Sequence, residues 1–443
     1  MKKILLIGAG RSATVLIGYL LEQARQHDFF VTVADANEAL ARQKTGDHPN
    51  GRAVRLDAAN PADRRDLVAR HDVVVSMLPP QMHIEVALDC LALGRHLLTA
   101  SYVSPAVQAL DADVRSHGLV FMNELGLDPG LDHMSAMQRI NAIRADGGNM
   151  TAFYSHCGGL VAPESDDNPW HYKFSWNPRN VVLAGQGTAQ YLEDGKMRFV
   201  PYRRLFGQHR LIEVPGMGQW EVYANRDSLH YREAYGLADV RTLLRGTIRH
   251  RGYCTAWDAL VQIGLTDGNF PIPGSENLTY LGLMEAYSGG ENGAITVRER
   301  IADLIGSRQD GPVMHQLDWL GLFDERPIGL KNATPALVLE HLLLEKWALR
   351  PDDKDMVIMQ HEFEYELDGR PRRHISTLVA TGNDGTDTAM SRLVGLPLGV
   401  FAKLLLLGEI NTVGVNIPIM PEVYEPVLAE LESLGVRFEE REG

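Results

Sequence analysis

Short apolar runs alternate with amphipathic, helix-like segments through the first 125 residues. The first run, 3–7, leads into a turn that contains glycine, and apolar residues then recur at helical spacing. Five more apolar runs are typical of strands, and they lie at 30–34, 53–56, 72–78, 96–100 and 119–122. Helices are predicted between them, at 61–70, 83–93 and 105–117. This alternation predicts an α/β fold that begins with a doubly wound parallel sheet of the Rossmann type.

The turn after the first strand carries a glycine pattern suited to a dinucleotide. Gly8 permits the tight turn, Gly10 lets the backbone approach a pyrophosphate, and the small Ala13 allows close packing of helix on strand. The first turn of the helix offers free N–H groups to phosphate. Asp35 ends the second strand, where it can accept hydrogen bonds from the adenosine ribose. An incidental turn and a solvated strand end are the alternatives, and this order of elements disfavours both.

Ligands bind at the carboxyl ends of the strands in a sheet of this type. Residues 123–130 follow the last predicted strand and form a loop rich in glycine and proline, before a helix that ends at 147. The glycine turn and the strand ends together supply the candidate cofactor residues. They are Gly8, Gly10, Arg11, Ser12, Ala13, Asp35, Asp57, Ser76, Leu78, Ser101, Leu127 and Asp128.

The alternating rhythm is lost from residue 151, which predicts a second domain of another kind. Residues 157–176 read as loops dense in polar and aromatic side chains, and 237–346 read as mainly helical. Two alternating runs, 357–366 and 374–380, predict antiparallel strands around a turn at 368–369. A helix broken at 395–397 and a final amphipathic helix at 424–434 complete the chain.

Composition and charge narrow the classes of function. A length of 443 residues suggests two or three domains, and a formal net charge of −14 disfavours general nucleic-acid binding. The three cysteines are far apart in sequence, which argues against a zinc ribbon or a disulfide framework and fits a reducing cytosol. The N-terminal apolar run is short for a signal peptide, and no uncharged apolar stretch reaches the roughly 18 residues of a membrane span. We expect a cytoplasmic protein that binds neither membranes nor nucleic acid.

Other catalytic motifs give no competing signal. The sequence has no HExxH, no GxxxxGK[ST] and no evident GxSxG. His361 and Glu362 look like part of a metal-binding string. On an alternating strand, however, His361 shares its face with Phe363, so strand packing is the better interpretation. No metal is predicted, and hydride transfer at the dinucleotide is the strongest chemical signal.

Several strings of residues resemble the saccharopine dehydrogenase family, in its glutamate-forming branch. They keep the family's order over nearly the whole chain, and they are TASYVSP at 99–105, NELGLDPGLDH at 123–133, CGGL at 157–160, YKFSW at 172–176, NRDS at 225–228, RGTIR at 245–249 and VGLP at 394–397. The resemblance implies oxidation of the secondary amine of saccharopine to L-glutamate and 2-aminoadipate 6-semialdehyde in lysine metabolism, or the reverse reductive condensation. Related enzymes that join another amine to a semialdehyde or a 2-oxo acid, as in carboxynorspermidine formation, are one alternative. A dinucleotide-binding protein without turnover is the other.

The resemblance also assigns residues to the substrate. It implies a pocket formed by Ser101, Tyr102, Asp128, Arg226, Thr247, Ile248 and Arg249. Asp128 would hold the substrate's ammonium group, and the two arginines would meet its carboxylates. The candidates for acid–base catalysis are Tyr102, Asp128, Cys157 and Lys173. A structural cysteine beside a glycine turn is the alternative for Cys157.

The coenzyme is predicted from one departure from the family. This chain has Asp35 and Ala36 at the positions where the NADP-dependent fungal members of the family resemble a Cys-Arg pair. It therefore lacks the arginine that could bind the 2′-phosphate of NADP. We therefore predict NAD over NADP, although Arg11 offers a cation for the pyrophosphate or for a 2′-phosphate. The family further implies a Rossmann domain at 1–125 completed by 390–443, and a substrate-binding α+β domain at 126–389 with a helical insertion near 237–346. Substrate would lie in the cleft between these domains, and a homodimer is expected by analogy.

Overall fold

The structure is a computed structural model that describes residues 1–289 and 295–442. Its internal contacts divide the chain into two compact units. The first unit comprises Met1–Met150, Glu366–Pro371 and Ala380–Glu440, and the second comprises Thr151–Tyr365, Arg372–Val379 and Arg441–Gly443. Residues 290–294 of the predicted insertion, and residue 443 of the predicted C-terminal segment, lie outside the described residues.

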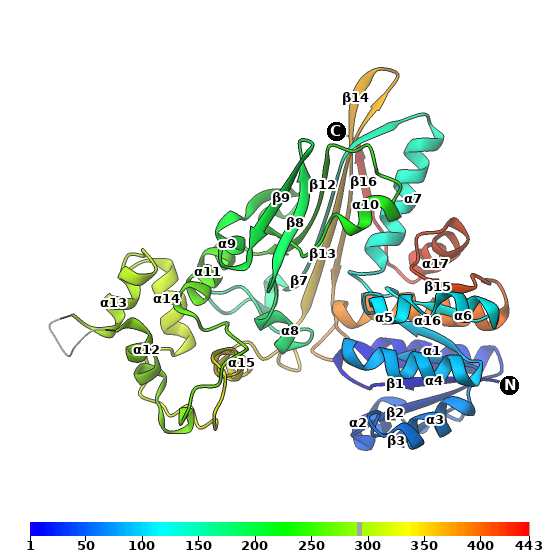
Figure 1. Ribbon diagram of the computed structural model, residues 1–443, viewed down its shortest axis with the longest axis horizontal. Helices are drawn as coiled ribbons and strands as arrows, with labels where there is room; N and C mark the ends of the chain where they lie inside the picture. The colour runs from blue at the N-terminus through cyan, green and yellow to red at the C-terminus, as the bar shows by residue number, and fades with distance from the viewer. Residues whose placement is uncertain (290–294, 443) are drawn as a thin grey trace. The chain divides into compact units, whose positions relative to one another are not determined.

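Seven parallel strands form the sheet of the first unit, in the order β15-β6-β5-β4-β1-β2-β3. Figure 1 labels β1, β2, β3 and β15 of this sheet. Their bounds are β1 Lys2–Ile7, β2 Phe29–Asp35, β3 Gly51–Arg55, β4 Val73–Ser76, β5 His96–Thr99, β6 Val120–Met122 and β15 Gly414–Asn416. Strand β4 is buried throughout, which is why it reads as a continuous apolar run. The chain order reverses at β1 and β4, the switch point where doubly wound sheets bind nucleotides. The predicted parallel α/β sheet is confirmed.

Nine helices belong to the described part of the first unit. They are α1 Thr14–Gln26, α2 Glu38–Thr45, α3 Pro61–Ala69, α4 His83–Leu93, α5 Pro105–Gln108, α6 Asp111–Ser116, α7 Leu131–Ala145, α16 Ala389–Leu407 and α17 Pro421–Ser433. The single helix expected at 105–117 is thus two short ones. Helix α7 packs against α17, so it belongs to this unit although we predicted a boundary before it.

Helix α16 is continuous, and the predicted break at 395–397 is wrong. Two glycines let α16 pack closely against α1. A Cβ on Gly395 would lie 2.8 Å from the backbone nitrogen of Leu16, and one on Gly399 would lie 2.5 Å from Tyr19 Cδ1. Close packing against α1 stabilises α16, so the helix continues past Pro397 without a break. Among the described helices, α16 alone has the length and composition to cross a membrane. Most of it is buried, as in a core helix of a folded domain.

A mixed sheet supports the second unit, in the order β10-β11-β12-β7-β13-β14-β16, with β8 paired to β12 and β9 (Figure 1). The bounds are β7 Asn149–Val161, β8 Thr188–Glu193, β9 Lys196–Pro201, β10 Arg210–Val214, β11 Gly218–Ala224, β12 Thr242–Arg249, β13 Asp355–Leu367, β14 Arg370–Thr381 and β16 Glu439–Glu442. Strands β7 and β12 run parallel, while β11 and β12 are antiparallel. The predicted pair of strands around 368–369 is confirmed.

Two predictions for this region are wrong. Residues 157–160 lie within β7 instead of in a loop, and 242–249 form β12 instead of a helix. Both strands are buried along almost their whole length, so they show none of the alternation that marks a half-exposed strand. Gly158 fits because a Cβ there would lie 2.5 Å from the carbonyl oxygen of Ile248.

The remaining described helices, apart from α10, contribute buried side chains to one hydrophobic core that includes a cluster of aromatic rings. The bounds of the remaining helices are α8 Pro178–Val182, α9 Tyr202–Leu205, α10 His230–Ala234, α11 Tyr253–Ile263, α12 Tyr280–Ser288, α13 Val297–Leu304, α14 Pro312–Leu320 and α15 Pro335–Lys346. Trp347 stacks on Trp257 with ring centroids 6.0 Å apart and meets Trp170 edge-on at 5.4 Å. This core anchors the aromatic segment 170–176, which the sequence marked as a loop dense in aromatic residues.

Candidate functional site

The glycine turn lies at the carboxyl end of β1, as predicted from its residues. Gly8 has a φ of +103°, and a Cβ there would lie 3.0 Å from the carbonyl oxygen of Met77. Asp35 is tied to this turn, because its Oδ2 accepts the N–H of Ala9 at 2.7 Å and its Oδ1 accepts the N–H of Asn37 at 2.8 Å. The carboxylate charge of Asp35 is therefore fixed beside the turn.

Lys44 adds a cation that the sequence did not reveal. Its Nζ donates a hydrogen bond to the carbonyl oxygen of Gly10 at 2.6 Å. Burial lowers the pKa of Lys44 to about 8, although the charge of Asp35 opposes that shift. Lys44 lies in α2, and nothing in its spacing from Gly10 suggests that the two meet.

The other predicted cofactor residues occupy the same edge of the sheet. Arg11, Ser12 and Ala13 continue the turn as a short 3₁₀ segment. Asp57 follows β3, where its Oδ1 accepts the N–H of Ala59 at 3.0 Å. Leu78 is half-buried after β4, and Leu127 is buried in the loop after β6.

A buried histidine joins the ends of β4 and β5. His83 Nδ1 lies 2.9 Å from Ser76 Oγ, and its Nε2 lies 2.8 Å from Ser101 Oγ and 3.3 Å from Thr99 Oγ1. Burial lowers the pKa of His83 to about 4, so the imidazole is neutral near pH 7. Sequence reasoning named both serines but missed His83, whose position at the start of α4 brings it between them.

Tyr102 and Asp128 meet directly. The Tyr102 hydroxyl donates to Asp128 Oδ1 at 3.2 Å. Their two loops are held together by Glu124, whose Oε1 accepts the N–H of Val103 at 3.0 Å and whose Oε2 lies 2.7 Å from His133 Nε2. Glu124 and His133 stand in one of the family-like strings, but nothing in the string alone indicates this buried pair.

The second unit holds a buried arginine within a cage of tyrosines. Arg249 ends β12 with only 2% of its surface exposed, and its guanidinium carbon lies 5.2, 5.7 and 5.3 Å from the ring centroids of Tyr172, Tyr223 and Tyr253. Burial raises the pKa of all three tyrosines, against the effect of the Arg249 charge, so their hydroxyls are neutral near pH 7.

The charge of Arg249 has no anionic partner among the residues that the structure describes. Its Nη1 donates to the carbonyl oxygen of Ile248 at 2.8 Å and its Nη2 to the Tyr223 hydroxyl at 3.5 Å. Its buried Nε has no hydrogen-bond partner in this part of the chain. A buried cation in this state is suited to receive a carboxylate.

The structure places the remaining predicted residues in the second unit as well. Thr247 lies opposite Cys157 in the paired strands β12 and β7, and both Ile248 and Cys157 are buried. Arg226 follows β11 with a φ of +45° and borders a cavity of about 440 Å³ with Asp227. The substrate candidates thus fall into two groups, with Ser101, Tyr102 and Asp128 in the first unit and the others in the second.

Lys173 is engaged in ion pairs. Its Nζ lies 2.8 Å from Asp353 Oδ2 and 3.0 Å from Asp167 Oδ1, and the side chain is almost fully buried. These contacts join the segment 170–176 to the residues before β13. The Lys173 ammonium group already pairs with two carboxylates. Proton transfer by Lys173 stays a prediction.

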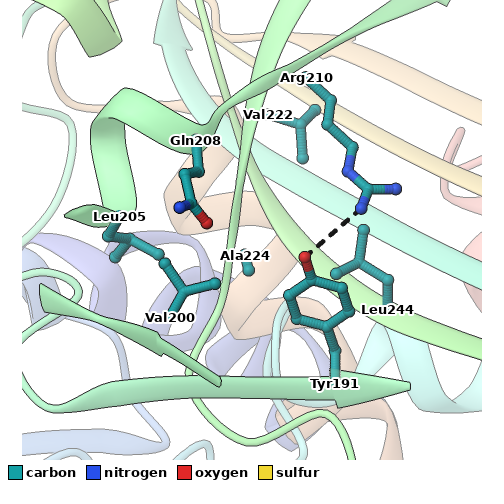
Figure 2. Close-up of a pocket in the computed structure, with 8 residues that line it drawn as sticks. All are labelled: Tyr191, Val200, Leu205, Gln208, Arg210, Val222, Ala224 and Leu244. Atoms are coloured by element: carbon teal, nitrogen blue, oxygen red, sulfur yellow. Dashed lines mark hydrogen bonds between the residues drawn. The ribbon is translucent and has the colours of Figure 1, made fainter. Parts of the chain in front are cut away.

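A second cavity is too small for a substrate. Figure 2 shows Tyr191, Arg210 and six neighbours around it, with the Arg210 Nη2 to Tyr191 hydroxyl hydrogen bond of 3.4 Å. Its volume is about 10 Å³, which is the room of about one water molecule.

Comparison with known proteins identifies the family. Two family models match, the saccharopine dehydrogenase NADP binding domain over residues 4–122 and the saccharopine dehydrogenase C-terminal domain over residues 126–436. The NADP(+), L-glutamate-forming saccharopine dehydrogenases of Pyricularia oryzae and Saccharomyces cerevisiae are 33% and 32% identical, over 99% of this chain and of each of theirs. The mitochondrial alpha-aminoadipic semialdehyde synthase of Bos taurus is 34% identical, and the match covers 99% of this chain but 47% of that protein.

A solved structure agrees with these matches. The apo saccharopine dehydrogenase (L-Glu forming) of Saccharomyces cerevisiae is 31% identical and has a TM-score of 0.89, with all of both chains covered. The resemblance inferred from the seven strings is thereby confirmed, together with a domain of the type that binds a nicotinamide dinucleotide. The chain belongs to the saccharopine dehydrogenase family.

Proposed function

We propose that the chain is an L-glutamate-forming saccharopine dehydrogenase. It oxidises the secondary amine of saccharopine and releases L-glutamate and 2-aminoadipate 6-semialdehyde, or it runs the reverse reductive condensation in lysine metabolism. The observation that carries the proposal is the buried Arg249 guanidinium, which lacks a carboxylate partner within the described residues. A substrate with three carboxylates supplies the missing anion, and family membership supports the rest of the assignment.

Each candidate residue then has a chemical role. Arg249 and Arg226 bind substrate carboxylates, while the Asp128 carboxylate holds the ammonium group and Tyr102 orients it through their hydrogen bond. Ser101 is fixed by His83 and contacts both substrate and coenzyme. When bound at this turn, the dinucleotide would supply the hydride acceptor for the carbon beside the bridging nitrogen, and water would hydrolyse the resulting imine. Tyr102 exchanges a proton with Asp128 through their hydrogen bond, and Cys157 and Lys173 remain the other candidates for acid–base catalysis.

NAD is the proposed coenzyme in preference to NADP. Hydrogen bonds from two backbone amides fix Asp35 at the turn, and a 2′-phosphate there would meet a second negative charge. The contrary indications are the NADP in the family model and in the names of relatives, and the cation of Lys44 near Gly10. Calorimetric titration of the purified chain should give a lower Kd for NADH than for NADPH. Tighter binding of NADPH would overturn the preference.

Turnover tests the proposed reaction. Purified chain mixed with NAD or NADP and saccharopine should increase the absorbance of the reduced nicotinamide, and glutamate should form in equal amount. Reaction only with another amine and a semialdehyde would support the carboxynorspermidine-like alternative. Coenzyme binding without any oxidation would support a non-catalytic role.

Assembly and compartment are proposed only by analogy. We expect a homodimer in the cytoplasm, although the name of the bovine relative places that protein in mitochondria. Light scattering coupled to size-exclusion chromatography measures the mass directly, and a mass of 49.1 kDa would correspond to the monomer.

A further inference from the structure

A carboxylate and two imidazoles come together in the second unit, at Asp166, His171 and His250. One potential ligand atom from each lies within 4.8 Å of the other two. His171 Nδ1 is 2.6 Å from Asp166 Oδ2, and the rings of His171 and His250 stack with centroids 4.0 Å apart. None of the three belongs to the candidate coenzyme or substrate residues.

The carboxylate has an unmet electrostatic requirement. Asp166 Oδ1 is buried, and no hydrogen-bond donor reaches it from the described residues. Most buried carboxylate oxygens accept hydrogen bonds or contact a cation. The imidazole of His171 satisfies only Oδ2, so a cation would complete the environment of this side chain.

Local structure holds two of the three ligands in place. Asp166 and His171 belong to one turn, 166–171, in which the N–H of His171 donates to the carbonyl oxygen of Asn168 at 3.0 Å. Asn168 also accepts the N–H of Trp170 at 3.0 Å, and the Trp170 side chain is fully buried in the aromatic core. His171 has a φ of +51°, a conformation that the turn imposes on it.

A backbone hydrogen bond of His250 leaves its other ring nitrogen available as a metal ligand. Its Nδ1 lies 3.2 Å from the carbonyl oxygen of Arg251, so this nitrogen carries the proton and Nε2 presents a lone pair. Metal-binding histidines commonly donate their other ring N–H to a backbone carbonyl in this way. The Trp220 ring packs against the His250 ring edge-on, with ring centroids 5.3 Å apart.

We propose that Asp166, His171 and His250 bind one divalent transition-metal ion of the zinc type. Two imidazoles and a carboxylate suit such an ion, whereas magnesium prefers oxygen ligands alone. The ligand atoms must close from within 4.8 Å to about 3.3 Å, the separation in a tetrahedral zinc site. An ion bound at His171 Nδ1 would replace the hydrogen bond between this nitrogen and Asp166 Oδ2, and it would link the turn 166–171 to the residue that follows β12.

The sequence predicted no metal, because His250 is far along the chain from Asp166 and His171 and the three residues match no spacing motif. The site stands on its own geometry and does not depend on the proposed reaction. Its test therefore uses metal binding and spectroscopy, and its failure would leave the saccharopine assay unaffected.

Calorimetry of the full chain, stripped with a chelator and free of a histidine tag, should show one Zn²⁺ bound per chain and no binding of Mg²⁺. Asp166→Asn and His250→Ala should each weaken Zn²⁺ binding by at least about tenfold. His315→Ala removes an exposed histidine of α14 and should leave the affinity unchanged. Circular dichroism establishes that each variant is folded.

Cobalt provides the second readout. Co²⁺ should give the visible absorption of a low-coordinate nitrogen and oxygen site in the unchanged chain and in His315→Ala, but not in His250→Ala. Failure of Zn²⁺ to bind stoichiometrically would overturn the proposal. Equal affinity in the unchanged chain and in both ligand variants would show an adventitious ion only and would overturn it as well.

Discussion

Replacement of Arg249 by methionine separates the stability of the fold from the binding of substrate. Removal of one member of a buried ion pair typically costs about 3–5 kcal/mol, because the other charge is left behind. Arg249 has no such partner among the described residues, and its guanidinium is only 2% exposed. The substitution therefore leaves no carboxylate stranded.

The remaining contributions to stability oppose one another. Methionine loses the cation–π contacts with three tyrosines, each worth roughly 0.5–2 kcal/mol, and the hydrogen bonds of the guanidinium. It also removes the desolvation penalty of a buried ion, which is several kcal/mol. We expect these effects to cancel to within about 1 kcal/mol, so the free energy of unfolding of Arg249→Met without substrate should lie near that of the unchanged chain.

Substrate binding should respond quite differently. Loss of a charge-assisted contact to a substrate carboxylate costs about 2–4 kcal/mol, which weakens saccharopine binding roughly 30-fold to 700-fold. Urea denaturation measures the first quantity, and the KM for saccharopine measures the second. Arg251→Met is the matched control, because Arg251 is exposed two residues further on, and it should change neither quantity appreciably.

The opposite pattern would refute this reasoning. If Arg249→Met lost about 3–5 kcal/mol of stability while the folded protein kept its KM, Arg249 would be a structural cation. The saccharopine assignment would then lose the observation that carries it. Thermal melts with and without saccharopine give an independent check, because only a chain that binds the substrate gains stability from it.

Three further outcomes follow from buried polar groups. Burial lowers the pKa of His83 to about 4 from an ordinary value of about 6.5, so the unfolded chain takes up the proton first as the pH falls. The free energy of unfolding should therefore fall as the pH falls from about 6.5 to 4. In urea titrations, His83→Leu should show a smaller dependence of this free energy on pH. His83→Leu should also reduce kcat by about tenfold or more and raise the Kd for coenzyme, because Ser76 and Ser101 both lose their partner. Lys173→Met should destabilise the fold by about 3–5 kcal/mol, since the largely buried Asp353 keeps its charge, whereas Asp167 retains its ion pair with Arg350. Steady-state kinetics on the folded fraction should show an unchanged kcat, and a reduced kcat would show that Lys173 transfers a proton.

The first unit was predictable because its signals are local. A strand, a glycine turn, a helix and a second strand that ends in an acid follow one another in sequence. In the structure the glycine turn and the acid meet at the carboxyl ends of these two strands. Strand β15 was missed because it is only three residues long and pairs with β6 from almost 300 positions away. Short strands that complete a sheet from a distance carry too few residues for a periodic pattern.

The second unit was less predictable because burial removes the alternation on which the reading of strands depends. Strands β7 and β12 are covered on both faces, and their paired residues Cys157 and Thr247 are far apart in sequence. The tyrosine cage shows the same limit, since Tyr172, Tyr223 and Tyr253 come from a loop, a strand and a helix. The register of β11 against β12 pairs Tyr223 with Thr247, two residues before Arg249, whereas Tyr172 and Tyr253 reach the guanidinium from elements outside this pairing.

Two buried cations, Lys173 and Arg249, differ in whether the structure gives their charge an anionic partner. Lys173 and Arg249 are equally concealed, and the sequence offered both as functional residues. Lys173 has two carboxylates within 3.0 Å, so its charge is already balanced in the unliganded chain. Arg249 finds neutral tyrosines and a backbone carbonyl instead, within the part of the chain that the structure describes. Because a buried charge is stable only when it is compensated, we infer that Lys173 anchors the fold and that Arg249 completes its environment when an anionic substrate binds.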